Sequence, residues 1–328
     1  MNVLLIQIDG KLPNLALMRL AAYHRERGDE VALNRRVDMF CRTYDRVYAS
    51  TIFKASGQKV EQLRYYRPDA LIGGTGIDNT NKLSDIGIGD GPIDYSLWPE
   101  FRSSIGYTQR GCRLRCSFCG VPEKEGRPTF SNNVNGIWRG EPWPRELFLL
   151  DNDFFGVPAW RDRIREMIDG HFKVSFNQGV NVRLMTEEQA ACVAAVDYRD
   201  GDMKARRFYT AWDNRNDEQV LFRGLNWLVK YGMKPDHLMV YMLIAYWPGE
   251  TASDWNYRRQ KLRDFGARPY PMPYIRTPET RGFQRWVIGA YDKRVCWDDW
   301  KLANYNPRNL NLYPEGDCNG VSTEFVWR

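Results

Sequence analysis

The first 76 residues alternate between apolar runs and amphipathic stretches, which predicts strands alternating with helices. Residues 2–8 (NVLLIQI) have the apolar character of a short buried strand. Between Pro13 and Arg27 apolar side chains recur at helical spacing, and Gly28 is placed to end that helix. The order repeats with strands expected at 31–33, 47–51 and 70–74, and with a polar helix ending near Tyr66. Such alternation predicts a parallel sheet.

A longer series of the same kind begins after residue 100. Glycine and proline punctuate residues 73–99, which predicts a linker and a domain boundary near residue 100. Strands are expected at 104–109, 147–150, 172–176, 207–211, 238–244 and 270–275. Helices are expected at 158–169, 186–196, 217–231 and 252–265, the second and fourth opened by the capping residues Thr186 and Thr251.

The fold class is therefore α/β, with a partial (β/α)6 barrel of the TIM type preceded by a small Rossmann-like domain. In such barrels the active site lies where the strands end. We expect an amino-terminal domain and linker at 1–99, the barrel at 100–291 and an irregular tail at 292–328. That tail and the residues before it hold aromatic side chains that either pack in the core or stack on exposed bases: Trp286, Trp297, Trp300, Tyr305, Tyr313 and Trp327.

Composition excludes several classes of protein. The 328 residues are 43% hydrophobic and 27% charged, which is ordinary for a folded chain and argues against disordered, collagen-like and disulfide-scaffold proteins. The net charge of +6 is only mildly basic. No run approaches the roughly 18 apolar residues of a membrane span, and the first ten residues lack a leader pattern. We expect a cytoplasmic protein with no membrane partner.

Three of the seven cysteines fall within eight residues, and this clustering is the strongest indication of function in the sequence. Cys112, Cys116 and Cys119 have the spacing C-x3-C-x2-C directly after the first expected barrel strand. Three thiolates on one loop can hold a soft metal ion or an iron-sulfur cluster. Structural zinc usually takes four ligands, so a cluster with one iron left open fits the count better. The alternatives are three incidental cysteines, or a zinc site completed by Cys192, Cys296 or Cys318.

The sequence resembles the radical S-adenosylmethionine (SAM) superfamily, and within it the branch of cobalamin-binding enzymes and tRNA methylthiotransferases. The resemblance covers about residues 104–275 and rests on five segments in order: RGCRLRCSFCGVPEKEG (110–126), LLDNDFF (149–155), FNQGVNVRL (176–184), FYTAWDN (208–214) and YWPGET (246–251). It implies that the three cysteines are the catalytic metal ligands of a [4Fe-4S] cluster whose fourth iron binds SAM. It also implies an electron donor such as flavodoxin or ferredoxin, and a 5′-deoxyadenosyl radical that attacks the substrate.

The resemblance further implies which residues hold SAM. Phe118 lies beside the cluster, the segment Asp151, Asn152 and Asp153 lies against the amino group, and Arg183 and Asn177 are candidates for the carboxylate and the ribose. Trp212 and Asp213 end the fourth strand, and Gly249 and Glu250 lie where the backbone approaches adenine. Packing and capping are the ordinary alternative for each of these residues. Three arginines around the cysteines either favour the reduced cluster, meet an anionic substrate or are simply solvated: Arg110, Arg113 and Arg115.

The chain also departs from these relatives. Its first 100 residues resemble a shortened cobalamin-binding domain, but Asp9 is followed by Gly10 and Lys11, so the D-x-H-x-x-G motif and its cobalt-binding histidine are missing. We therefore favour a domain without cobalamin. The methylthiotransferases carry three further amino-terminal cysteines and a basic β-barrel, whereas here only Cys41 precedes the core and no such barrel is expected, which argues against tRNA methylthiolation. The alternative function is a cobalamin-dependent or methylthiotransferase-like modification of a tRNA base. A non-catalytic iron-sulfur or zinc scaffold would lack the SAM motifs. The substrate class, small molecule, peptide or nucleic acid, is left open.

Overall fold

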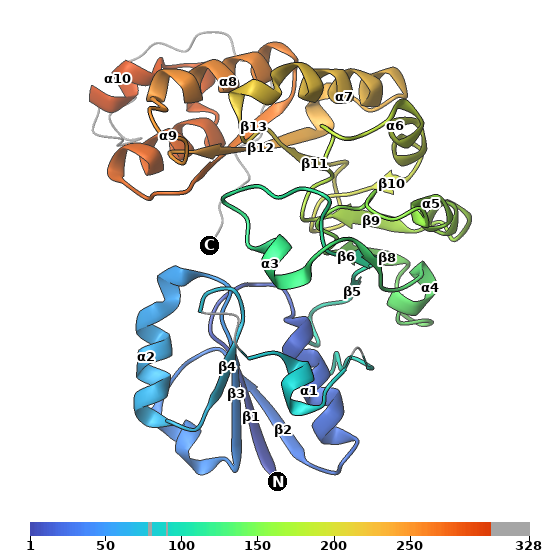
Figure 1. Cartoon of the computed structure of the whole chain (residues 1–328), viewed down its shortest axis with the longest axis vertical. Helices are drawn as coiled ribbons and strands as arrows, with labels where there is room; N and C mark the ends of the chain where they lie inside the picture. Colours follow the sequence, from blue (N-terminus) through green and yellow to red (C-terminus); the bar gives the residue numbers. More distant parts are fainter. Residues whose placement is uncertain (78–80, 90, 303–328) are drawn as a thin grey trace.

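A computed structural model describes residues 1–77, 81–89 and 91–302 and shows a mixed α/β protein (Figure 1). The amino-terminal part is a parallel sheet with the strand order β2-β1-β3-β4. Its strands are β1 (Asn2–Gln7), β2 (Glu30–Asn34), β3 (Arg46–Ser50) and β4 (Leu71–Gly73). The parallel sheet predicted from the alternating pattern is thus confirmed.

Helices α1 (Leu15–Arg25) and α2 (Gly57–Tyr66) lie on opposite faces of this sheet (Figure 1). Successive residues of β1 point to opposite faces, so Leu5 packs in the core on the α1 side and Leu4 in the core on the α2 side. The side chain of Asn14 accepts hydrogen bonds from the first turn of α1 and so fixes where that helix begins. Short 3-10 helices complete this part at Met39–Thr43, Lys54–Ser56 and Leu83–Ile86.

The second part contains two further parallel sheets, with the orders β10-β9-β8-β5 and β11-β12-β13. The strands are β5 (Ser104–Gly106), β8 (Glu146–Leu149), β9 (Lys173–Phe176), β10 (Asp197–Tyr198), β11 (Phe208–Ala211), β12 (Leu238–Ile244) and β13 (Arg268–Pro273). The segment after β9 meets β11 where Val180 N donates to the Tyr209 carbonyl at 2.8 Å. Within the described ranges the strands do not close into a ring.

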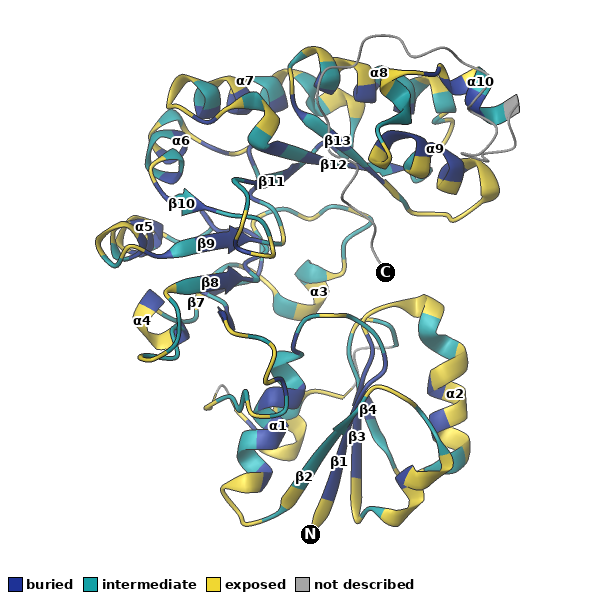
Figure 2. Ribbon diagram, turned by 180° about the vertical axis from the view of Figure 1, so that it is seen from behind, coloured by how far each residue is buried: buried dark blue, intermediate teal, exposed yellow. Residues whose placement is uncertain are grey.

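The helices of this part alternate with its strands, as predicted. They are α5 (Trp160–Asp169), α6 (Glu187–Ala194), α7 (Glu218–Lys230), α8 (Ala252–Asp264) and α9 (Pro278–Ile288). Figure 2 shows their solvent-facing sides exposed and the strands beneath them buried. The sequence did not predict α9 or β10. Smaller elements are β6 (Gln109–Arg110), which pairs antiparallel with β7 (Thr129–Phe130), α3 (Val121–Glu125), α4 (Val134–Ile137) and the 3-10 helices Arg215–Asp217 and Pro235–His237.

The prediction of an irregular tail from residue 292 is wrong for its first part. A 3-10 helix (Tyr291–Lys293) leads into α10 (Trp297–Leu302). The helix is held because Trp286, Trp297 and Trp300 are buried and Trp286 Nε1 donates to the Val295 carbonyl at 2.9 Å. These three tryptophans therefore serve core packing. Tyr305, Tyr313 and Trp327 lie outside the described residues.

One apolar core joins the two parts. Leu17 of α1 packs in the same cluster as Ile105 and Phe148 from β5 and β8. The connection predicted as a linker takes part in this contact, because Trp98 Nε1 donates to Gln7 Oε1 at 3.1 Å. The amino-terminal part is thus packed directly against the inner side of the second sheet.

A cavity of about 2710 Å³ remains between the two parts. On one side it is lined by the loops that follow β1, β3 and β4, and on the other by loops at the carboxyl ends of β8 and β9. In open α/β sheets this edge is where ligands bind. None of the helices described is both long and apolar enough to cross a membrane.

Candidate functional site

The three clustered cysteines lie in the loop between β6 and α3, where all are half-buried. The loop folds back on itself: Cys119 N donates to the Cys116 carbonyl at 3.0 Å, and Leu114 N lies 3.4 Å from Cys112 Sγ. Burial raises the pKa of the Cys112 and Cys119 thiols, and the neighbouring cysteines raise it further. The thiols are therefore close enough to influence each other's charge, although in the part of the chain described no set of three His, Cys, Asp or Glu side chains has the geometry of a metal site.

An ion pair fastens this loop to the end of β8. Arg113 Nε and Nη2 donate to Asp153 Oδ2 and Oδ1 at 2.7 and 2.9 Å, and Arg113 N donates to Oδ2 at 3.1 Å. The Asp153 carboxylate is only 1% exposed, while the arginine side chain reaches the surface. A bidentate pair fixes orientation as well as distance, so it sets the path of the chain between Cys112 and Cys116.

The neck of the loop is closed by Glu125, which the sequence analysis did not single out. Its carboxylate accepts hydrogen bonds from Gly111 N and Asn152 Nδ2, both at 3.0 Å, and lies 3.5 Å from Arg110 Nη2. Gly111 has φ of +85° and a Cβ there would meet the Arg127 carbonyl at 2.4 Å, so only glycine fits. The sequence did offer a signal for Glu125, because it is an acidic residue directly before Gly126, where α3 ends.

Asp151 forms hydrogen bonds with the residues that directly precede the cysteine loop. Its Oδ1 accepts from Thr108 Oγ1 at 2.8 Å and from Gln109 N at 2.6 Å, and its Oδ2 is buried without a hydrogen-bond partner among the described groups. Burial raises the pKa of this carboxyl to about 6. Asp151 and Asp153 are thus engaged with protein donors, and Asn152 is the member of the segment that lines the cavity.

The structure brings Arg183 to the cysteine loop. Its Nη1 donates to Asp217 Oδ2 at 2.7 Å, and its Nη2 lies 3.8 Å from Cys116 Sγ. Burial by itself lowers the pKa of Arg183, but Asp217 and Cys116 outweigh it and the pKa is raised. Asn177, from the same segment after β9, lines the cavity. A cation is therefore held directly beside one thiol.

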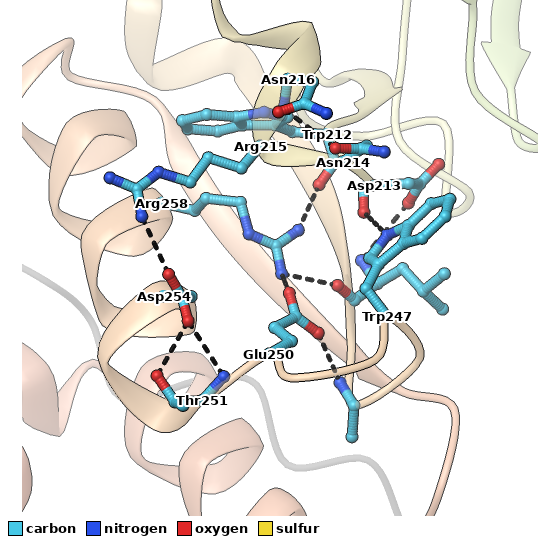
Figure 3. Close-up of polar contacts among 12 residues, drawn as sticks. Trp212, Asp213, Asn214, Arg215, Asn216, Trp247, Glu250, Thr251, Asp254 and Arg258 are labelled. Carbon is cyan, nitrogen blue, oxygen red and sulfur yellow. Dashed lines mark hydrogen bonds and ion pairs between the residues drawn. The ribbon is translucent and has the colours of Figure 1, made fainter.

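The ends of β11 and β12 are joined by a buried arginine that the sequence analysis missed (Figure 3). Arg258 of α8 donates to the Trp212 and Leu243 carbonyls, each at 2.8 Å, and pairs with Glu250. The second oxygen of Glu250 accepts from Ala245 N at 3.0 Å. Trp212 is fully buried, and so packs rather than faces the cavity. A signal existed in the sequence, because Arg258 falls on the buried stripe of its helix between Trp255 and Leu262.

The other candidates lie around this loop in different settings. Asp213 is near Cys119 and Arg183, and burial raises the pKa of its carboxyl. Phe118 lines the cavity, with its ring 5.4 Å from that of Tyr246. Gly249 has φ of +77° and open space around it, and Arg115 is exposed.

Comparison with protein-family models found none that matches the chain, and comparison with curated proteins found no matching relative.

Proposed function

We propose that this protein is a radical SAM enzyme that carries a [4Fe-4S] cluster on Cys112, Cys116 and Cys119. The observation that supports it best is the way the cysteine loop is held: Arg113 and Asp153 fasten it to the end of a parallel strand, beside a large cavity. Burying a carboxylate is costly, so the buried Asp153 that fixes this loop supports a functional loop over one with three incidental cysteines.

The residues present suit such a cluster. Three half-buried sulfur atoms provide the soft donor set that iron-sulfur clusters take, and the Leu114 N–H directed at Cys112 Sγ is the kind of contact that tunes cluster potential. Arg183 beside Cys116 offsets the negative charge that thiolate ligands bring. When bound and reduced by a donor such as flavodoxin or ferredoxin, the cluster supplies the electron that cleaves SAM to methionine and a 5′-deoxyadenosyl radical.

The chain's own groups supply the recognition of SAM in this proposal. SAM carries a carboxylate, an ammonium group and a sulfonium, so its site needs a cation together with carboxylate or amide acceptors. Arg183, beside Cys116, offers the cation. Asn152 and Asn177, which line the cavity, and Asp213, which lies near Cys119, offer acceptors. Arg258 and Glu250 do not contact SAM in this proposal. They position Asp213, because Arg258 binds both Glu250 and the carbonyl of the preceding residue, Trp212. We infer that the second part is a partial (β/α)6 barrel, with SAM bound where its strands end.

The amino-terminal domain in this proposal is a doubly wound parallel sheet of order β2-β1-β3-β4 that carries no cobalamin. Asp9 follows β1 by two residues, and its carboxylate accepts hydrogen bonds from Thr51 Oγ1 at 2.8 Å and from Ile52 N at 2.7 Å. Its carboxylate is therefore bound to the loop after β3, and Lys11 stands where the D-x-H-x-x-G motif has its histidine. The described residues that line the cavity at this edge include no histidine to bind cobalt, and the proposed reaction does not use cobalamin.

The test is to reconstitute the protein with iron and sulfide without oxygen, reduce it with dithionite and add SAM. Formation of 5′-deoxyadenosine is the expected result. S-adenosylhomocysteine as the sole product would overturn the radical chemistry. Added hydroxocobalamin is expected to separate from the protein on gel filtration, and a stoichiometric corrinoid that stays bound would redirect the assignment to methyl transfer or to modification of a tRNA base.

A further inference from the structure

Three tyrosines that have no role in the proposed cluster or SAM site gather on the inner face of the β11-β12-β13 sheet. Along β12 the residues facing the helices, such as Val240 and Met242, are fully buried, whereas Tyr241 between them is half-buried and lines the cavity. Tyr270 lies directly opposite Tyr241 in the strand register, and Tyr209 projects from β11 to the same side. Three neighbouring strands thus present phenol rings to one space.

The rings form a continuous aromatic surface. Tyr209 and Tyr241 are stacked, with ring centres 5.7 Å apart and planes 9° from parallel. The Tyr270 ring stands edge-on to Tyr241 at 5.5 Å. A core stack would be fully covered by further side chains, but all three tyrosines are only half-buried and line the cavity, and the core of this sheet lies on its opposite face. The surface is therefore available to a ligand.

The tyrosine hydroxyls add a polar edge to this surface. Burial raises the pKa of Tyr209 to about 12, and it also raises the pKa of Tyr241 and Tyr270, so all three remain neutral phenols at physiological pH. Within the described part of the chain, no protein group forms a hydrogen bond with the hydroxyl of Tyr241 or Tyr270. A neutral phenol both donates and accepts, so these two hydroxyls can meet a polar substituent on a ligand.

The same cavity carries aromatic and apolar side chains toward the cysteine loop. Tyr246 contacts both Phe118 and Tyr274, with ring centres 5.4 and 4.7 Å apart, and Phe118 directly precedes Cys119. Ile52 and Phe53 of the amino-terminal domain line the cavity too, and they are 42% and 53% exposed. The cavity thus joins the three tyrosines to apolar side chains of both domains and to Phe118, the neighbour of Cys119.

We propose that the substrate of this enzyme is a molecule with a planar aromatic ring and a neutral polar substituent, and that the ring packs against Tyr241 and its two neighbours. That the bound molecule is a substrate rests on the proposed function. The binding surface itself does not, because it exists without the cluster. Aromatic pairs are more stable than their buried area alone predicts, so the surface should distinguish a planar ring from a saturated one of the same skeleton.

The test compares 2-naphthol with decahydro-2-naphthol, which share a skeleton and a hydroxyl, in equilibrium binding to the full chain without cluster. We expect 2-naphthol to bind more tightly by on the order of two- to twelvefold, the range that one aromatic pair gives. Tyr241→Leu should abolish that preference and Tyr241→Phe should keep it, because the ring is what matters. Tyr65→Leu on exposed α2 is the matched control and should change nothing.

Equal affinity of the two probes, or a preference that survives in Tyr241→Leu, overturns the proposal. Tyr241→Phe reports on folding, since a variant that keeps the ring and the preference shows that the surface is intact. Iron and sulfide uptake measured on Tyr241→Leu should match the unsubstituted protein. Failure of the binding test therefore leaves the assignment of the cysteine loop unaffected, and failure of SAM cleavage leaves the binding result unaffected.

Discussion

Arg113 donates hydrogen bonds to both carboxylate oxygens of Asp153, and this contact joins the cysteine loop to the end of β8. Three residues separate Cys112 from Cys116, and Arg113 is the first of them, so the pair controls the part of the loop that sets the distance between those two thiols. The stability of the loop and its capacity to bind iron should therefore depend on the same contact.

Arg113→Met is expected to lower the free energy of unfolding by about 2 kcal/mol, because a charge-assisted hydrogen bond to a buried carboxylate is lost. It should also reduce the iron bound per chain after reconstitution. Urea unfolding and iron analysis check the two results. Arg115→Met, an exposed arginine on the same loop, is the control and should leave both unchanged. Full iron uptake by Arg113→Met would show that the pair does not shape the loop.

Asp151 should make stability depend on pH in mildly acidic solution. Burial raises its pKa to about 6, above the value of about 4 in an unfolded chain. Between these values the folded protein holds a proton that the unfolded chain releases. The stability that Asp151 contributes is therefore greatest below pH 4 and falls as the pH rises to 6, by about 2 to 3 kcal/mol. Asp151→Asn should remove this fall.

Urea unfolding at several pH values from 4 to 7 measures the effect. Asp169→Asn, which changes an exposed carboxyl at the end of α5, should keep the profile of the unsubstituted protein. An unchanged profile in Asp151→Asn would mean that this carboxyl is already ionised in the folded protein at pH 4.

Arg183→Ala should weaken SAM binding to the reconstituted protein by about 1.5 to 3 kcal/mol, on the order of 10- to 150-fold, if the guanidinium meets the SAM carboxylate. The iron content should stay the same. Anaerobic equilibrium binding gives the affinity, and Arg161→Ala, which removes an exposed surface arginine, is the matched control. Unchanged SAM affinity would remove Arg183 from the site.

Arg258→Met should destabilise the protein by about 3 to 5 kcal/mol, because it leaves the Glu250 carboxylate buried without its partner. The double variant Arg258→Met with Glu250→Gln should recover part of this loss, since no charge is then left uncompensated. Urea unfolding of the single and double variants checks this. A double variant as unstable as the sum of two independent losses would argue against direct coupling.

The apolar and polar pattern predicted most of the architecture but little of the site's detail. Strands such as Leu238–Ile244 are short continuous apolar runs between turn residues, which sequence alone reveals. The cysteine spacing is equally local. The partner of Arg113 is 40 residues away, and the register that brings Asp153 to it depends on tertiary packing. The burial of Arg258 could not be predicted either, because the two carbonyls that accept its hydrogen bonds come from the ends of different strands and meet only in the folded structure.

Electron paramagnetic resonance of the reconstituted and dithionite-reduced protein, recorded with and without SAM, tests directly whether the three cysteines hold a [4Fe-4S] cluster that binds SAM. We expect one [4Fe-4S] signal per chain that changes when SAM is added. We expect no such signal in Cys112→Ala, Cys116→Ala or Cys119→Ala, and an unchanged one in the control Cys296→Ala, an exposed cysteine outside the loop. A full cluster signal in all three loop variants, or one that SAM does not alter, would contradict the proposal.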